Sequence, residues 1–346
     1  LYVGKPGSLE SQLVPKAGFA FKGIQFTGMP RKRSLRLPLE MIAWTAQLVT
    51  GVLQAMYYLK EFRPDVGFGT GGYVSAPVLM AARLCGFPYV VHEPDAHAGL
   101  VNRLLGRWAS AGTGAFPEAA KLMQAKAFHL TGNPLRGPIG VQGRPESIAR
   151  LNQAYGLTWL PSDTILVVTG GSQGARSINQ AVVNALPHLL KENGLKIIHQ
   201  TGQKLFDETR GQLTALNLAE HPDYLVRPFF DDMASVWGAG NMALCRSGSL
   251  TLSELFLSQL PAILVPFPYA AADHQRKNAQ SAERQGAAVM ILDHELSADR
   301  LLNQVQQLLA MPERLQEMQR ACQALAQPEA TVKIVSLLKT LALSVK

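Results

Sequence analysis

The 346-residue sequence predicts an α/β protein made of two doubly wound domains, each a parallel β-sheet covered on both faces by helices. Three observations lead to this fold class. Short apolar runs alternate with longer amphipathic stretches through most of the chain. Several of these runs end in a glycine-rich turn that opens a helix, as in residues 165–176. Prolines and glycines cluster at residues 131–138, where we predict a hinge between the two domains.

The elements of the first half follow from helical periodicity, from capping residues and from glycine or proline stops. Short apolar runs predict strands at residues 1–4, 21–27, 65–68, 89–92, 112–116 and 128–130. Helices are expected at residues 9–17, 39–62 and 100–108, and from the turn after residue 69 to residue 84.

The second half alternates more regularly, which indicates a mostly parallel sheet. Strands are expected at residues 164–169, 195–200, 224–228, 242–245, 261–266 and 289–291. Helices are expected at residues 178–191, 205–216, 232–238, 251–259 and 275–285. From Pro312 onward the pattern is helical and is interrupted at Pro328.

Composition restricts the class of protein and of partner. Hydrophobic residues make up 47% of the chain and charged residues 17%, which is typical of a globular protein with large cores. The formal net charge of +8 favours anionic partners such as nucleotides or an anionic membrane surface. We expect no nucleic-acid partner, because the basic residues form no long tract and no zinc-finger or RNA-binding pattern occurs. Cys85, Cys245 and Cys322 are too few and too far apart for a disulfide framework, which indicates a reduced, cytoplasmic setting.

Three predicted strands end in turns that are suited to hold a phosphate. Gly170 begins the first turn, Gly69 begins a second with the sequence Gly-Thr-Gly-Gly-Tyr, and Arg246 begins a third with Arg-Ser-Gly-Ser. A turn that opens a helix presents backbone N–H groups at the positive end of the helix. Ligands of doubly wound folds bind beyond the carboxyl ends of the strands, so we expect pyrophosphate-bearing ligands in a cleft between the two domains.

Residues 246–254 allow two interpretations. Ser249 and Thr251 stand where a helix begins, and Glu254 lies in its first turn. In a nucleotide site, amides and hydroxyls there would hold a pyrophosphate, and the carboxylate would accept both hydroxyls of a ribose. Alternatively, Thr251 and Glu254 form a capping box that closes the helix start. The nearby Gly170 turn favours the nucleotide site.

Two more polar segments follow predicted strands. Residues 266–278 open a helix, where polar side chains would bond sugar hydroxyls or Asp273 would simply be an N-cap. His92 and Glu93 end another strand and would either line the cleft or make a structural hydrogen bond.

No metal and no cofactor are predicted. The sequence has neither a His-Glu-x-x-His motif nor a cysteine cluster. Asp231 and Asp232 are adjacent, whereas sugar-nucleotide enzymes that hold a divalent ion use Asp-x-Asp spacing. Helix ends and Arg136 would therefore neutralise a departing diphosphate.

Two segments bear on membrane contact. Arg31, Lys32, Arg33 and Arg36 are interleaved with leucines, a combination that rests on anionic lipid or forms an ordinary solvated loop. The apolar stretch at residues 39–59 approaches the length of a transmembrane span. Its polar residues recur on one face, however, and we predict a mostly buried amphipathic helix.

Taken in order, these motifs resemble those of the MurG family, the peptidoglycan N-acetylglucosaminyltransferases of the lipid-linked pathway. The resemblance covers nearly the whole chain and rests on residues 69–75, 132–136, 170–176, 230–233, 245–254, 266–278 and 328–331. It implies the GT-B fold, in which two Rossmann-like domains face each other across a cleft. It also implies an acceptor and membrane-side domain at residues 1–135, a UDP-sugar-binding domain at residues 136–325 and a C-terminal helix at residues 326–346 that crosses back to the first domain.

The resemblance implies inverting transfer of GlcNAc from UDP-GlcNAc to the C4 hydroxyl of undecaprenyl-pyrophosphoryl-MurNAc-pentapeptide (lipid I). The product is lipid II, which is used in peptidoglycan synthesis, cell-wall biogenesis and cell division. The implied location is the cytoplasmic side of the bacterial inner membrane, as a peripheral protein with an anionic lipid surface as partner. Two other functions stay open: a UDP-sugar-binding fragment without turnover, and another GT-B enzyme that acts on a lipid acceptor.

Site residues follow from the resemblance by position. Ser172 and Arg136 would contact the diphosphate, the backbone at Phe230 would read uracil, and Gln275 would bind the GlcNAc hydroxyls. The set implied to bind UDP-GlcNAc is Asp95, Arg136, Ser172, Phe230, Ser249, Leu250, Thr251, Leu252, Ser253, Glu254 and Gln275. The set implied to face the diphosphate of lipid I is Thr70, Gly71, Gly72 and Tyr73.

The sequence departs from the family pattern in two places. The family begins with a further strand, a glycine loop ending in His and a helix, a unit of about 30 residues that we expect this chain to lack. That His is often assigned as the base, so no residue of this chain is assigned that role. Where the family reads His-Glu-Gln-Asn, this chain has Pro94 and Asp95 after His92 and Glu93, which places a carboxylate near the expected diphosphate.

Overall fold

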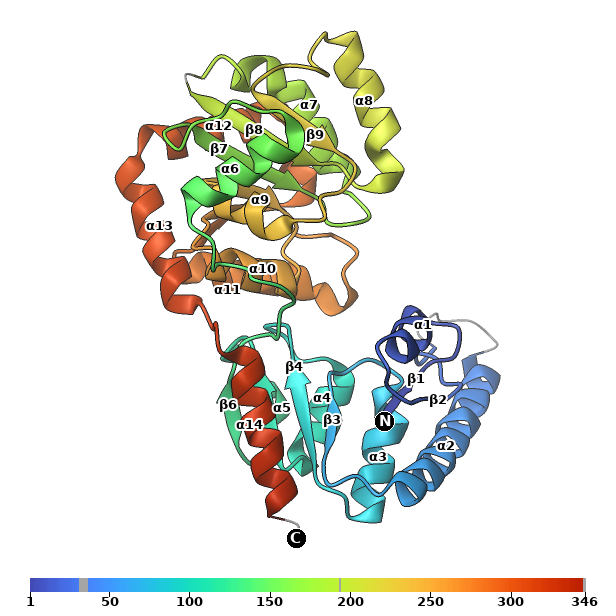
Figure 1. Cartoon of the computed structure of the whole chain (residues 1–346). Coiled ribbons are helices and arrows are strands. Elements are labelled where there is room, and N and C mark those ends of the chain that lie inside the picture. The colour runs from blue at the N-terminus through green and yellow to red at the C-terminus, as the bar shows by residue number, and fades with distance from the viewer. Residues whose placement is uncertain (31–36, 193, 345–346) are drawn as a thin grey trace. The chain divides into compact units, whose positions relative to one another are not determined.

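The computed structural model describes residues 1–30, 37–192 and 194–344, which form two compact units (Figure 1). The first unit comprises Leu1–Gly132 together with Glu329–Lys346, and the second comprises Asn133–Pro328. Both units contain parallel sheets and helices, so the predicted α/β class is confirmed.

The first unit is built on a four-stranded parallel sheet in the order β3-β4-β5-β6 and a separate parallel pair, β1-β2. The strands are β1 (Tyr2–Gly4), β2 (Phe21–Gly23), β3 (Gly67–Gly69), β4 (Tyr89–Glu93), β5 (Ala111–Gly114) and β6 (Phe128–Leu130). The helices are α1 (Leu9–Lys16), α2 (Leu37–Phe62), α3 (Ser75–Cys85), α4 (Leu100–Leu105), α5 (Glu118–Met123) and α14 (Ala330–Leu343), with a 3-10 turn, η1, at Gly106–Trp108.

Helix α2 differs from the prediction of a mostly buried helix. It packs against α3 and contributes Val52, Ala55 and Leu59 to the core of the first unit. Its outer face is apolar and exposed, because Ile42 and Leu53 keep 68% and 60% of their surface accessible. Among the described residues, no helix combines the length and apolarity needed to cross a membrane.

The second unit is built on a six-stranded parallel sheet in the order β12-β11-β10-β7-β8-β9. The strands are β7 (Thr164–Thr169), β8 (Leu195–Gln200), β9 (Tyr224–Arg227), β10 (Met242–Cys245), β11 (Ala262–Leu264) and β12 (Ala288–Met290). Chain order runs from β7 outward to β9 on one side and from β10 outward to β12 on the other. The order therefore reverses between β7 and β10, which is where doubly wound folds bind their ligands.

Helices cover this sheet. They are α6 (Arg144–Tyr155), α7 (Arg176–Leu189), α8 (Phe206–Ala215), α9 (Met233–Ala239), α10 (Ser249–Leu257), α11 (His274–Arg284), α12 (Ala298–Ala310) and α13 (Pro312–Leu325), with 3-10 turns η2 (Gln203–Leu205), η3 (Ala271–Asp273) and η4 (Asp293–Glu295). Helix α7 packs against α8 and α12, while α6 packs against α9 and α10 packs against α13. The apolar faces of the strands and of α7 and α12 form one large core.

Helices α5, α6 and α12 are absent from the sequence-based prediction. Helix α6 carries few buried apolar side chains, chiefly Ile148 and Leu151, so its periodicity is weak. By contrast, the predicted bounds of β6, β7, β8 and β10 agree with the structure, because these strands are short apolar runs flanked by turn residues.

Candidate active site

The two central strands of the second unit end side by side. Thr169, the last residue of β7, is the Cα partner of Cys245, the last residue of β10. The turn that begins at Gly170 and the turn that begins at Arg246 therefore leave the sheet from neighbouring positions. Each turn opens a helix, so two helix N-termini start close to one edge of the sheet. This arrangement is suited to bind an anion with two charged groups, such as a diphosphate.

The Gly170 turn is held tightly against the strands. The Thr169 hydroxyl accepts a hydrogen bond from the Gly171 N–H at 3.0 Å. Gly174 has φ of +78°, and a Cβ built there would lie 2.1 Å from the carbonyl oxygen of Thr201, so only glycine fits. Helix α7 follows without a side-chain cap, and Ser172 is exposed in the middle of the turn. The N–H groups of Gly171 and Gly174 are bonded within the protein, so the amides of Ser172 and Gln173 and the Ser172 hydroxyl are the groups of this turn suited to meet a phosphate.

The second turn does not contain the capping box that we weighed as an alternative. Helix α10 begins at Ser249, and its N-cap is Gly248, which has no side chain to cap the helix. The Glu254 carboxylate lies beyond the first turn and accepts a hydrogen bond from Trp237 instead of the helix backbone. The capping-box interpretation is therefore wrong, and the nucleotide-site interpretation of this segment stays a prediction.

The other residues of this segment that were predicted to bind UDP-GlcNAc differ in how far they are exposed to a ligand. Leu252 is buried in the core, so only its backbone could meet a ligand, whereas Leu250 is exposed. The Ser253 hydroxyl donates to the Ser249 carbonyl oxygen at 3.0 Å. Thr251 is half-buried.

Glu254 is half-buried, and its surroundings shift the pKa of its carboxyl group. Burial raises the pKa of this carboxyl above its usual range, and the hydrogen bond from Trp237 partly opposes that rise. The bond joins the indole Nε1 of Trp237 to Oε2 of Glu254 at 3.0 Å. A half-buried carboxylate with one oxygen already held is well placed to accept hydroxyl hydrogens from a ligand.

The Phe230 backbone is tied to the phosphate turn through a chain of buried polar groups. The Phe230 N–H donates to Oε1 of Gln200 at 3.0 Å, and Nε2 of Gln200 donates to the Thr169 hydroxyl at 3.0 Å. That hydroxyl is the one that holds Gly171. The Phe230 ring is buried and packs edge-on against Tyr155, so the segment that follows β9 has a fixed backbone.

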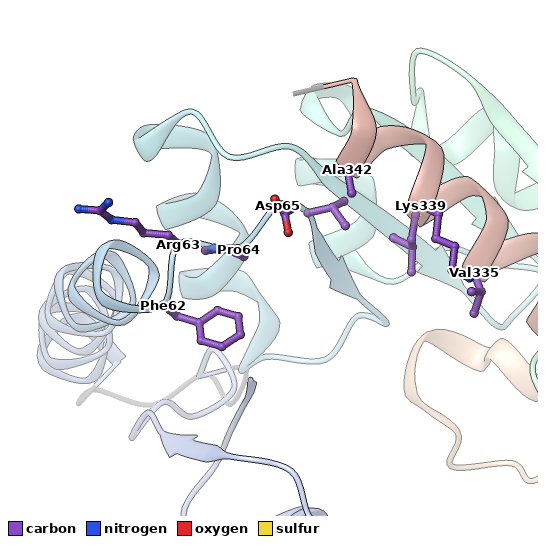
Figure 2. A pocket seen from close by; sticks show the side chains of 9 residues that line it. Phe62, Arg63, Pro64, Asp65, Val335, Lys339 and Ala342 are labelled. Carbon is purple, nitrogen blue, oxygen red and sulfur yellow. The ribbon is translucent and has the colours of Figure 1, made fainter. Parts of the chain in front are cut away.

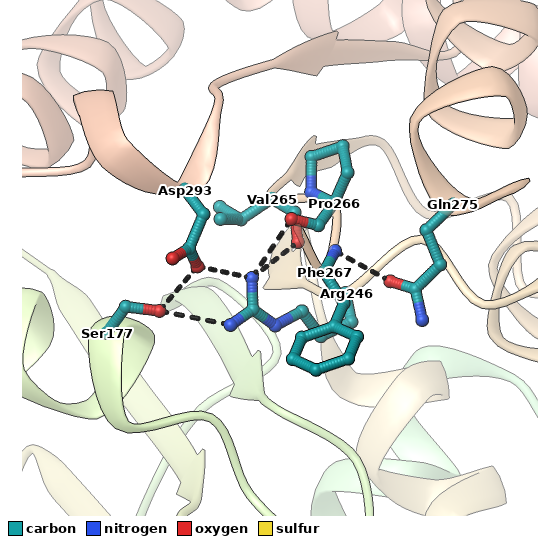
Figure 3. Close-up of polar contacts among 7 residues, drawn as sticks. All are labelled: Ser177, Arg246, Val265, Pro266, Phe267, Gln275 and Asp293. Atoms are coloured by element: carbon teal, nitrogen blue, oxygen red, sulfur yellow. Dashed lines mark hydrogen bonds and ion pairs between the residues drawn. The ribbon is translucent and has the colours of Figure 1, made fainter. Parts of the chain in front are cut away.

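Arg246 fastens the loops at the same edge of the sheet (Figure 3). Its guanidinium donates to the carbonyl oxygens of Val265 and Pro266 at 3.1 and 3.2 Å and to the Ser177 hydroxyl at 3.0 Å. It also pairs with Asp293 at 2.5 Å. One side chain thereby joins the ends of β10 and β11, the segment after β12 and the first turn of α7.

Gln275 is positioned by two contacts. Its Oε1 accepts a hydrogen bond from the Phe267 N–H at 2.9 Å, and its carbonyl oxygen accepts one from the Ser247 hydroxyl at 2.8 Å. Asp273, one alternative for this segment, does precede α11, but it has φ of +56° and its side chain makes no cap. Arg136 is exposed near the start of the second unit.

The first unit carries the other predicted glycine turn. Gly69–Tyr73 joins β3 to α3, and Gly71 and Gly72 both have positive φ. A Cβ at Gly71 would lie 3.2 Å from Nδ2 of Asn102, so this position also requires glycine. Tyr73 is half-exposed, and Thr70 is exposed.

His92 and Glu93 are both buried and take structural partners. Nδ1 of His92 lies 2.9 Å from the Thr113 hydroxyl. The Glu93 carboxylate accepts hydrogen bonds from the Asp95 N–H, the Gly99 N–H and Nδ2 of Asn102 at 3.1, 2.8 and 2.9 Å. Burial raises the pKa of Glu93, and these three donors partly oppose the rise. Glu93 therefore fixes the loop that contains Asp95, which belongs to the first unit, unlike the other residues predicted to bind UDP-GlcNAc.

A separate pocket of about 450 Å³ lies in the first unit (Figure 2). Its lining combines the end of α2, residues that precede β3 and one face of α14; these residues are Phe62, Arg63, Pro64, Asp65, Val66, Val335, Leu338, Lys339 and Ala342. Residues 62–66 of the lining precede β3, whereas the Gly69 turn follows β3, so the pocket lies at the opposite end of that strand and is not part of the glycine-turn site.

In the described part of the chain, no group of three or more His, Cys, Asp or Glu side chains could hold a metal ion.

The site contains three residues that the sequence-based prediction lacks: Thr169, Gln200 and Trp237. Arg246 begins the third predicted turn, but no role as a link between loops was predicted for it. Gln200 and Trp237 each bond to a residue on another strand or helix, and no local pattern identifies them.

Comparisons with known proteins identify the family. Residues 2–112 match the glycosyltransferase family 28 N-terminal domain, and residues 165–334 match the glycosyltransferase family 28 C-terminal domain. A UDP-N-acetylglucosamine–N-acetylmuramyl-(pentapeptide) pyrophosphoryl-undecaprenol N-acetylglucosamine transferase of Desulfitobacterium hafniense is 38% identical over 97% of this chain and 89% of that protein. The corresponding transferase of Citrifermentans bemidjiense is also 38% identical over the same shares. These identities and coverages give no support to the expectation that the chain lacks a further strand, glycine loop and helix ahead of Leu1.

Solved structures give the fold. The crystal structure of Acinetobacter baumannii MurG has a TM-score of 0.76 and 28% identity, covering 98% of this chain and 90% of that one. A UDP-GlcNAc 2-epimerase from Neisseria meningitidis, bound to UDP-GlcNAc, has a TM-score of 0.62 at 12% identity over 95% of this chain and 88% of that one, and shows likeness of fold alone. The predicted GT-B fold is confirmed. With two family domains matched in order and relatives aligned over nearly the whole chain, this protein belongs to the MurG family of UDP-GlcNAc-dependent glycosyltransferases.

Proposed function

We propose that the protein transfers GlcNAc from UDP-GlcNAc to the C4 hydroxyl of lipid I, with inversion, and that the second unit binds the donor. The bond from the anomeric carbon to the diphosphate oxygen breaks as a bond to the C4 oxygen forms. UDP leaves with the bonding electron pair, and the hydroxyl proton passes to a general base, a role to which no residue is assigned. The proposal rests on family membership and on one structural observation: two helix-opening turns leave the sheet from the paired ends of β7 and β10.

These helix starts supply the electrostatics that the reaction needs. Negative charge grows on UDP as it departs, and the N-termini of α7 and α10 carry positive partial charge. The Gly170 turn, Ser172 and Arg136 would hold the diphosphate. This arrangement stabilises the leaving group more than the bound substrate, which is the condition for lowering the barrier.

The nucleoside would lie on the neighbouring elements. Glu254 would accept the two ribose hydroxyls, the backbone near Phe230 would read uracil, and Gln275 would bind the hydroxyls of GlcNAc. Each of these residues follows the carboxyl end of β9, β10 or β11, so all lie along one edge of the sheet.

The acceptor would bind to the first unit. The turn Gly69–Tyr73 opens α3, and the positive φ of Gly71 and Gly72 brings its backbone into a conformation suited to a diphosphate. Asp95 stands on the adjacent loop after β4 and would face a sugar hydroxyl.

We place the protein on the cytoplasmic face of the inner membrane through α2. The sequence of α2 has no charged residue between Glu40 and Lys60. Its exposed apolar side chains form a stripe that comprises Leu39, Ile42, Val49, Leu53 and Tyr57. An apolar helix face of this kind can enter the boundary of headgroups and acyl chains. The basic residues Arg31, Lys32, Arg33 and Arg36 lie outside the described residues and adjoin α2 in sequence, where they would attract anionic lipid.

Calorimetry tests the donor site. Glu254→Ala removes the acceptor of two ribose hydroxyls, and UDP binding should weaken roughly 10- to 100-fold. The exposed Glu317→Ala serves as a control for loss of a negative charge. Equal UDP affinity in wild type and Glu254→Ala would remove Glu254 from the site.

Product analysis tests the reaction. Incubation with labelled UDP-GlcNAc and a lipid I analogue should give lipid II, whereas diacylglycerol should neither react nor compete. Binding of UDP-GlcNAc without product would favour a sugar-nucleotide-binding protein, and glycosylated diacylglycerol would favour the other enzyme.

For the membrane surface, Ile42→Glu combined with Leu53→Glu should reduce binding to anionic vesicles without changing UDP affinity.

A further inference from the structure

Trp237 is a buried side chain whose indole N–H, its one polar group, donates to Glu254, the residue proposed to bind the ribose. The indole keeps 1% of its surface accessible and is among the largest fully buried side chains of the protein. Its Nε1 donates to Oε2 of Glu254 at 3.0 Å. Burying an indole N–H is favourable only when it finds an acceptor, so this contact fixes both groups.

The contact joins two helices that follow each other in the chain, on either side of β10. Trp237 lies on α9, and Glu254 lies on α10. Helix α9 itself is anchored at its start, where Asp232 accepts a hydrogen bond from the Ser235 N–H at 3.0 Å. The residues directly before it, around Phe230, are held through Gln200 and Thr169 to the phosphate turn.

These bonds connect the three parts of a nucleotide site. The Gly171 amide is bonded to Thr169, the Phe230 amide is bonded to Gln200, and the Glu254 carboxylate is bonded to Trp237. Without the indole, the Glu254 side chain would have no hydrogen bond to the described residues, and it would sample other rotamers at an entropic cost to binding.

We infer that Trp237 is the positioning residue for ribose recognition: its indole N–H holds Oε2 of Glu254 so that the carboxylate is oriented toward the hydroxyls of the bound nucleotide. The inference rests on the proposed role of Glu254. It adds that selectivity for a ribonucleotide over a deoxyribonucleotide depends on a residue that does not touch the ligand.

The experiment compares UDP and 2′-deoxy-UDP by calorimetry on the whole chain. In Trp237→Phe, which keeps an aromatic ring and loses the N–H, UDP binding should weaken about three- to tenfold. Binding of 2′-deoxy-UDP, which keeps only one of the two hydroxyls, should weaken by a smaller factor, so the preference for the ribonucleotide should fall. A matched control is Trp159→Phe, because Trp159 is also buried in the second unit and its Nε1 donates to the Pro222 carbonyl oxygen at 2.9 Å, away from Glu254. That control should leave both affinities unchanged.

Glu254→Gln separates failure of the inference from failure of the proposed function. If Glu254→Gln does not alter the preference for UDP over 2′-deoxy-UDP, the ribose role of Glu254 is wrong, and the inference falls with it. If Glu254→Gln abolishes the preference and Trp237→Phe leaves it intact, only the inference is wrong. The double variant should show no preference beyond that of Glu254→Gln.

A general structural role of Trp237 predicts a different result. In that case Trp237→Phe would weaken both nucleotides by the same factor, which overturns the inference. Should Trp237→Phe fail to fold, site-specific replacement of Trp237 by its benzothiophene analogue gives the same comparison, because sulfur replaces the N–H in a ring of almost the same shape.

Discussion

Lowering the pH should destabilise the second unit through one buried histidine. His199 is fully buried on β8, with Nδ1 lying 2.7 Å from the Tyr224 hydroxyl and Nε2 lying 3.1 Å from Oδ1 of Asn179. Because Nδ2 of Asn179 donates to the Thr201 carbonyl oxygen, its Oδ1 is an acceptor and Nε2 of His199 carries the proton. Burial lowers the pKa of this imidazole from 6.5 to about 3, so the ring is neutral at pH 7.

The sign and size of the effect follow from proton linkage. Between pH 6.5 and about 3 the unfolded chain binds this proton and the folded chain does not, so stability is lost as pH falls. At about 1.4 kcal/mol per pH unit, moving from pH 7 to pH 5 should cost about 2 kcal/mol of unfolding free energy from this one group. The loss bears on function, because Asn179 and Thr201 adjoin the Gly170 turn.

Urea unfolding, followed by tryptophan fluorescence, measures this loss of unfolding free energy. Trp44→Phe and Trp108→Phe remove the tryptophans of the first unit, so that Trp159 and Trp237 report on the second. His199→Gln should be less stable at pH 7 but should lose about 2 kcal/mol less than its parent between pH 7 and pH 5. Parallel losses in the two proteins would refute the reasoning.

Three other predictions concern the substrates. Gly71→Ala places a Cβ at positive φ within 3.2 Å of Asn102, so the KM for a lipid I analogue should rise severalfold while UDP affinity stays constant; an unchanged KM would show that the turn does not meet the acceptor. UDP affinity should fall as pH drops through the pKa of Glu254, which burial raises, and the fall should be smaller in Glu254→Gln; identical pH profiles would exclude an ionised Glu254 from binding. EDTA should leave UDP affinity unchanged, because the expected charge partners are helix ends; loss of affinity that Mg²⁺ restores would contradict this.

Local patterns were sufficient for the strands and turns that define the site. The run at Thr164–Thr169 and the glycines after it predict both β7 and the phosphate turn, because an apolar β-branched run and a glycine turn each have a direct physical meaning. The order of the sheet, and hence the pairing of Thr169 with Cys245, depends on long-range contacts that no local pattern contains.

Other features depended on what surrounds a residue. The apolar outer face of α2 has the same composition as a buried face, so the sequence alone could not show which side meets the core. Glu254 fits a capping box in the sequence, and only the position of Trp237, 17 residues earlier, shows where its carboxylate is directed.

A crystal structure with UDP-GlcNAc tests the central claim most directly. The account predicts that the diphosphate lies on the amides of the Gly170 turn and of the turn that opens α10, with the ribose hydroxyls within hydrogen-bonding distance of Glu254. A nucleotide bound to any other part of the second unit, or to the first unit, would contradict it.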